Sequence, residues 1–129
     1  MTPPRVLFAT AELTPVARVG GLAEAAAGLV RALRATDVDL DVVMPDYGGV
    51  ELAGQLEIAI EVPLWAGEVR ARRGTHSVAG ELTLVDVPGM QRPHPYVDEN
   101  GEGWPDNDHR FMAFSAAIAS LARSSRPDV

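Results

Sequence analysis

The apolar positions in the first third of the chain follow a strand–helix–strand order. Residues 5–10 form a short apolar run, which is typical of a buried strand. Apolar residues then recur at helical spacing, with Glu24 in the first turn of the expected helix and arginines in its last turn. Residues 40–44 are again short and apolar, and Pro45 ends them. We therefore expect a βαβ unit with two parallel strands.

One face of the expected helix is apolar, and it is predicted to pack on the sheet. Its members recur at the offsets 0, 3, 4, 7, 8 and 11, and they are Leu22, Ala25, Ala26, Leu29, Val30 and Leu33. The loop before this helix, residues 11–20, contains Pro15, which disfavours regular structure there.

The middle of the chain favours β-hairpins rather than further βαβ units. Residues 57–62 alternate weakly, residues 68–73 suit one arm of a hairpin, and residues 76–79 and 81–87 are strand-like. A loop over residues 88–105 follows, and loops of this length are often functional. The fold class predicted is therefore α/β: a mostly parallel sheet flanked by helices, with a hairpin-rich middle.

A second helix is predicted over residues 107–123. Phe111, Phe114, Ile118 and Leu121 form its apolar stripe, and Asp106 or Asn107 is its expected N-cap. Arg110 lies four residues after Asp106, so the two side chains are candidates for an ion pair on the helix surface.

Composition and charge exclude several classes of function. The chain has 129 residues and no cysteine. Its formal net charge is −7, so a general nucleic-acid partner is not expected. The three histidines show no metal-ligand spacing, and we predict neither a metal site nor a cofactor. No apolar run approaches the roughly 20 residues that a membrane span needs. The chain begins without a signal-peptide pattern, so the expected location is the cytoplasm.

Two adjacent glycines, Gly20 and Gly21, stand at the predicted start of the first helix, just behind Arg18. A helix start offers unpaired N–H groups and partial positive charge, and glycine lets an anion approach the backbone closely. The pair therefore suits a phosphate, with Arg18 as a charge-assisted partner. The simpler alternative is that the glycines only let the chain turn into the helix. The pattern matches neither the dinucleotide fingerprint nor a P-loop.

Several separated motifs, in the same order, resemble the bacterial glycogen synthases and plant starch synthases. That family opens with S/A-E-x-x-P and K-x-G-G-L-x-D before an alanine-rich helix; residues 11–15 read AELTP and residues 18–24 read RVGGLAE. The segments 42–47 (VVMPDY), 92–96 (RPHPY) and 106–111 (DNDHRF) also match its motifs, and residues 127–129 resemble the approach to its H-x-H-D-W strand. Arg18 and Glu24 stand where the family has lysine and aspartate, and arginine differs from lysine in geometry.

The resemblance implies a retaining glucosyltransferase with two Rossmann-like domains, the GT-B fold. Residues 1–129 would be a single, truncated N-terminal domain of that fold, inactive without the missing C-terminal domain. The glycine loop would hold the diphosphate of a nucleotide sugar, with ADP-glucose as the expected donor and an α-1,4-glucan as the acceptor. Arg18 is the implied catalytic residue, and the implied substrate-binding residues are Gly20, Gly21, Glu24, Tyr96 and Asn107.

The residues themselves leave other interpretations open. Tyr96 is equally explained as a loop aromatic packed on the surface, and Asn107 as a helix cap. Glu12 either fixes its loop by accepting backbone hydrogen bonds or is a solvated carboxylate. At the level of function, the alternatives are a non-catalytic module that binds glucan or a partner, another nucleotide-sugar glycosyltransferase, and an unrelated α/β nucleotide-binding domain.

Overall fold

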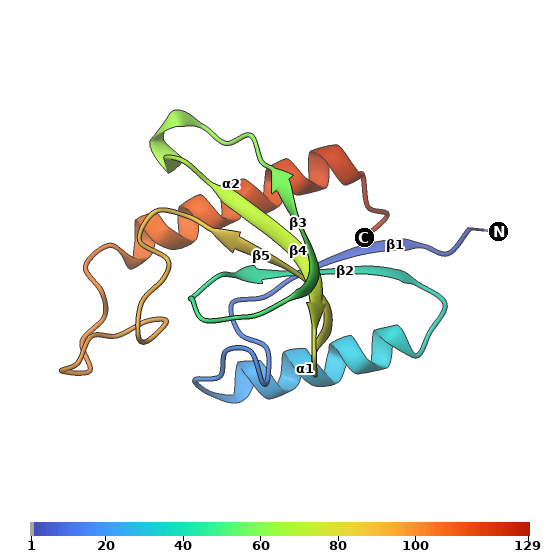
Figure 1. Ribbon diagram of the computed structural model, residues 1–129, viewed down its shortest axis with the longest axis horizontal. Helices are drawn as coiled ribbons and strands as arrows, with labels where there is room; N and C mark the ends of the chain where they lie inside the picture. The colour runs from blue at the N-terminus through green and yellow to red at the C-terminus, as the bar shows by residue number, and fades with distance from the viewer. Residues whose placement is uncertain (1) are drawn as a thin grey trace.

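A computed structural model describes residues 2–129 and shows one sheet between two helices (Figure 1). The elements follow in the order β1 (Arg5–Ala9), α1 (Gly21–Arg34), β2 (Asp39–Pro45), β3 (Ala53–Ala59), a 3-10 turn η1 (Leu64–Ala66), β4 (Arg70–His76), β5 (Gly80–Asp86) and α2 (Asn107–Ser125). The predicted βαβ unit and both predicted helices are confirmed.

The sheet has five strands in the order β1-β2-β5-β4-β3. β1 pairs in parallel with β2, and β2 in parallel with β5, whereas β5–β4 and β4–β3 are antiparallel. The predicted α/β class, with helices flanking the sheet and a hairpin-rich middle, is confirmed; the sheet is mixed, with a parallel half and an antiparallel half. The expected strand over residues 76–79 is wrong: His76 ends β4, and residues 77–79 form the tight turn into β5.

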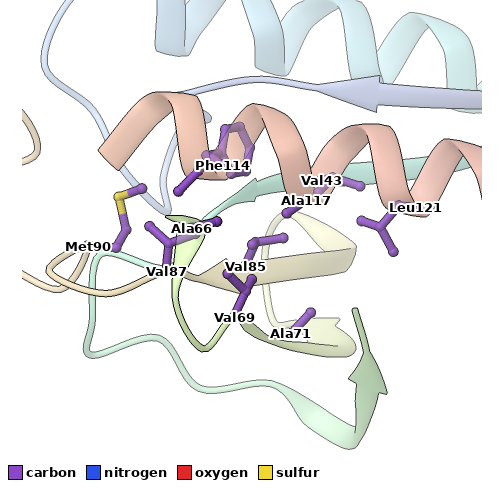
Figure 2. Close-up of a cluster of buried hydrophobic side chains, with 11 residues drawn as sticks. Val43, Ala66, Val69, Ala71, Val85, Val87, Met90, Phe114, Ala117 and Leu121 are labelled. Atoms are coloured by element: carbon purple, nitrogen blue, oxygen red, sulfur yellow. The ribbon is translucent and has the colours of Figure 1, made fainter. Parts of the chain in front are cut away.

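Successive side chains of β2 lie on opposite faces of the sheet. Val42 and Met44 of β2 belong to the core cluster beneath α1, whereas Val43 belongs to the cluster beneath α2. Figure 2 shows the second cluster, where Phe114, Ala117 and Leu121 of α2 lie over the sheet. The stripe predicted for this helix is largely confirmed, with Phe111 and Ile118 only partly buried at its margin.

The buried face of α1 differs from the predicted one. The residues that it buries are Ala23, Ala26, Ala27 and Val30. Leu22 and Leu29, predicted to be buried, are 50% and 47% exposed. The alanines allow the helix axis to lie close to the sheet, which leaves the longer leucines at the margin of the contact rather than under its centre.

The last residues of the chain lie along the outer edge of β1. The Asp128 N–H donates to Arg5 O at 2.7 Å, and the Leu7 N–H donates to Val129 O at 2.9 Å. The strand-like character expected of residues 127–129 therefore has its counterpart in the backbone contacts to β1.

Candidate functional site

The predicted site residues lie at one edge of the sheet, where the parallel strands end. In Figure 1 the carboxyl ends of β2 and β5 and the N-terminal ends of both helices are on the same side of the molecule. The loop after β1 leads into α1, and the loop over residues 88–105 leads into α2. Ligands of open α/β sheets bind at this edge, outside the carboxyl ends of the strands.

The two glycines at the start of α1 have no conformational or packing reason to be glycine. Gly20 is the N-cap residue, with φ −151° and ψ −156°, and neither glycine has a positive φ. A Cβ placed on Gly20 or Gly21 meets no atom within 4 Å. The turn-making interpretation therefore has little support, because another residue would fit this backbone without contact. Because Gly20 and Gly21 have no side chains, the space next to their Cα atoms at the start of α1 is open.

The backbone amides at this helix start are only partly free, which corrects the expectation that both glycine amides are unpaired. The Gly20 N–H donates to Glu12 Oε1 at 3.0 Å. Within residues 2–129, the Gly21 and Leu22 N–H groups have no acceptor. They are the orphan donors of a helix N-terminus and carry its partial positive charge.

Glu12 is the buried carboxylate that shapes this turn, only 5% exposed. Its Oε1 accepts the Val19 and Gly20 N–H groups at 2.8 and 3.0 Å, and its Oε2 accepts the Tyr96 hydroxyl at 2.8 Å. Burial alone would raise the pKa of Glu12, but these donors outweigh it and hold the pKa below its usual value. The interpretation of Glu12 as an acceptor of backbone hydrogen bonds is confirmed.

Tyr96 reaches the same place from the 88–105 loop. Its ring is partly buried, 5.8 Å from the Phe111 ring, and its hydroxyl donates to Glu12. Burial and the Glu12 carboxylate both raise the pKa of Tyr96 above its ordinary value. Tyr96 is therefore a protonated hydrogen-bond donor at neutral pH and is unsuited to act as a general base.

Asn107 and Arg110 hold the 88–105 loop rather than face the open space. Asn107 Nδ2 donates to Tyr96 O at 2.8 Å, and Asn107 Oδ1 accepts from Arg110 at 2.7 Å. Both ends of the Asn107 amide are thus engaged inside the chain. Arg110 is fully buried and also donates to Pro95 O and Met90 O. The predicted Arg110–Asp106 surface pair does not form.

Asp106 has a different partner from the ones expected. It stands at the N-cap position of α2 but makes no side-chain capping bond. Both of its carboxylate oxygens instead accept from Arg92, each at 2.6 Å. A bidentate arginine–carboxylate pair is stronger than a single cap bond, which explains the exchange. The Arg92 guanidinium also lies 5.0 Å from the centre of the Trp104 ring.

Arg18, from the loop before α1, contacts Glu24, from the first turn of that helix. Arg18 Nε lies 3.5 Å from Glu24 Oε1, which also accepts the Thr14 hydroxyl at 3.0 Å. The two side chains are 64% and 51% exposed, so this contact is weak and a stronger anion can compete for the guanidinium. The start of α1 therefore supplies two free amides, and an exposed positive charge is paired with Glu24 in its first turn.

Residues 2–129 offer neither a metal-binding cluster nor a membrane-spanning helix. Within residues 2–129, no three histidine or acidic side chains gather closely enough to hold a metal ion. In the same part of the chain, neither helix has the length and apolar character needed to cross a membrane.

Comparison with known proteins identifies the family of this chain. The sequence profile of the starch synthase catalytic domain matches residues 5–129. The chain belongs to the starch synthase catalytic domain family. A glycogen synthase of Halorhodospira halophila is 41% identical over 92% of this chain, and glycogen synthase 2 of Bradyrhizobium diazoefficiens is 38% identical over 98% of it. The resemblance drawn from the motifs is confirmed.

A solved member of the starch synthase family has the same fold. The catalytic domain of starch synthase IV from Arabidopsis thaliana, bound to ADP and acarbose, matches with a TM-score of 0.75 over 98% of this chain, at 23% identity. The chain spans about a quarter of these relatives: 26% and 27% of the two glycogen synthases and 27% of the solved chain.

Proposed function

We propose that this chain is the N-terminal part of a retaining glucosyltransferase that transfers glucose from a nucleotide sugar, ADP-glucose, to an α-1,4-glucan. Its family membership, and relatives named glycogen synthases, support the reaction class. The solved neighbour carries ADP and acarbose, a nucleoside diphosphate and an oligosaccharide analogue, which supports the donor and acceptor classes. In this proposal residues 1–129 act only together with a second domain across a cleft.

The observation that carries the proposal is the start of α1. The Gly21 and Leu22 amides have no acceptor in residues 2–129, and a Cβ built on Gly20 or Gly21 meets open space. Arg18 is bound to Glu24 of the same helix turn. A diphosphate fits this combination because helix-terminal amides and a guanidinium both donate hydrogen bonds to anionic oxygens. Gly20 takes part through the space it leaves rather than through its amide.

Each site residue then has a role in transfer. Arg18 and the Gly21 amide bind the diphosphate and stabilise the negative charge that develops on it as the bond to the sugar breaks. Glu24 holds Arg18 over the turn until the donor arrives. Tyr96, kept protonated, presents a fixed hydroxyl beside the turn. Asn107 supports Tyr96 by donating a hydrogen bond to the backbone oxygen of Tyr96. These assignments rest on positioning and charge, which suit phosphate as a leaving group.

A hollow in the 88–105 loop supports the glucan side of the proposal. Its volume is about 520 Å³, and it is lined by Pro93, His94, Val97, Asp98, Glu99 and Trp104. An indole ring beside carboxylates suits a sugar, which offers both apolar ring faces and hydroxyl groups. The same hollow favours a second candidate function, a non-catalytic glucan-binding module, which predicts glucan binding without transfer.

The test is glucose transfer by the longer protein that contains this chain. Purified protein is incubated with glycogen and either ADP-glucose or UDP-glucose, and the glucan-bound label and released nucleoside diphosphate are measured. We expect transfer from ADP-glucose in excess of transfer from UDP-glucose. Glucan binding with no transfer from either donor would favour the binding module and refute the enzyme.

Replacing Gly21 with alanine separates anion binding from turn making. Because the built Cβ has open space and φ is not positive, Gly21→Ala is expected to leave stability unchanged or to raise it by up to about 1 kcal/mol. The KM for the nucleotide sugar is expected to rise about 10-fold, since the methyl group displaces the anion from the amides. Thermal unfolding and initial rates measure the two effects.

The matched control is Gly28→Ala in the interior of the same helix. Its Cβ would lie 4.0 Å from Arg31 Nη2, an ordinary contact, so this change is expected to stabilise by about 1 kcal/mol with KM unchanged. If Gly21→Ala behaves like Gly28→Ala in both measurements, the glycine turn does not contact the donor.

A further inference from the structure

We infer that Glu12 is a positioning residue that determines which amides of the α1 start are left for the donor and couples that turn to the 88–105 loop. This inference rests on the proposed function for its kinetic consequence. Its structural basis is a single buried carboxylate that joins two loops distant in sequence: one oxygen accepts from residues 19 and 20, and the other from Tyr96, 84 residues away from Glu12.

The local bonds explain how Glu12 comes to face both loops. The Thr10 hydroxyl donates to Glu12 O at 2.8 Å and fixes the backbone just after β1. Glu12 is 5% exposed, and both of its carboxylate oxygens are engaged by donors of the chain. By accepting the Val19 and Gly20 N–H groups, it removes them from the set available to a ligand and leaves the Gly21 and Leu22 N–H groups as unpaired donors in residues 2–129. Without this acceptor, the helix would begin with four uncommitted donors in a loop free to move.

The second oxygen extends this control to the other loop. Tyr96 O accepts from Asn107, which is itself held by buried Arg110, so the loop position follows from α2. The hydroxyl bond to Glu12 then fixes the distance between the 88–105 loop and the glycine turn. The feature that matters is the reach of the side chain, because it has to span both loops at once.

Two conservative variants of the longer protein separate reach from charge. Glu12→Gln keeps the length and an oxygen that accepts from Val19 and Gly20, but it has no charge. Glu12→Asp keeps the charge and is one methylene shorter, so it cannot contact both loops. We expect Glu12→Gln to change KM for ADP-glucose less than about 10-fold, and Glu12→Asp to raise it about 10- to 100-fold. The value of kcat should change less than KM in both variants.

The opposite order would overturn the inference. If Glu12→Asp is close to wild type and Glu12→Gln is inactive, the charge itself acts in the reaction and Glu12 is not a spacer. Tyr96→Phe serves as a partial variant, because it removes only the second bond; its effect and that of Glu12→Asp should be less than additive, since both break the same link.

Hydrogen exchange makes this test independent of the reaction. Amides in residues 13–20 are expected to exchange at least 10-fold faster in Glu12→Ala than in wild type, because the Val19 and Gly20 N–H groups lose their acceptor. Residues 113–121 of α2 provide the internal control and should be unchanged. Normal exchange in Glu12→Ala would refute the inference even if transfer is found, whereas faster exchange without any transfer activity would refute only the proposed function.

Discussion

Replacing Arg18 with alanine in the longer protein is expected to lower kcat/KM for ADP-glucose by about 100- to 1000-fold, as the loss of one donor to a developing negative charge does elsewhere. The side chain is 64% exposed and makes one contact, at 3.5 Å, in residues 2–129. Its removal should therefore alter stability by less than about 0.5 kcal/mol. A large kinetic effect with a small thermodynamic one identifies a residue that contacts substrate rather than one that supports the fold.

Two further variants sharpen the interpretation of Arg18. Arg18→Lys keeps the positive charge, and should retain activity within about 10-fold if a charge near the phosphates is what the reaction requires. Arg31→Ala removes an exposed arginine at the opposite end of the same helix, and should leave kcat/KM unchanged. If Arg18→Ala transfers glucose as fast as Arg31→Ala does, then Arg18 has no part in the reaction.

Local patterns in the sequence predicted the elements well and their arrangement less well. Helical spacing located both helices, and short apolar runs located β1, β2 and β5. The same spacing did not show that alanines rather than leucines form the centre of the α1 contact, because periodicity gives the direction of an apolar stripe but not the distance to the surface it meets. The place of β5 between β2 and β4 depends on pairing between distant segments, which a local pattern does not contain.

The candidate site shows the same division between near and far contacts. Arg18, Gly20 and Glu24 lie within one loop and helix turn, so their proximity could be predicted from spacing. The bond between Glu12 and Tyr96 spans 84 residues, and only the family motifs around both residues hinted that they share a site. Arg110 was predicted to be a candidate partner of Asp106 because the two are four residues apart on a helix, and no local signal showed the carbonyl groups of the 88–105 loop to which it donates.

Buried Arg110 leads to the second large prediction, a loss of stability. Arg110→Met keeps an unbranched apolar stem, is shorter than arginine, and leaves Pro95 O, Met90 O and Asn107 Oδ1 without their donor. Burial lowers the pKa of Arg110, which reflects the cost of keeping its charge out of water, and the variant recovers that cost. Several unsatisfied acceptors outweigh the recovery, and we expect a net loss of about 3 kcal/mol.

The measurement is chemical denaturation of the longer protein, followed by limited proteolysis across residues 88–105. Arg123→Met, an exposed arginine on the same helix, is the matched control and should be within about 0.5 kcal/mol of wild type. Arg110→Lys keeps the charge with fewer donors, and its free energy of unfolding should lie between those of wild type and Arg110→Met. The prediction therefore stays testable if Arg110→Met does not fold. Because the 88–105 loop presents Tyr96 to Glu12, cleavage in this loop and the KM for ADP-glucose should rise together in the variants that fold. A stable Arg110→Met protein with an uncut loop would show that backbone geometry alone holds Tyr96 in place.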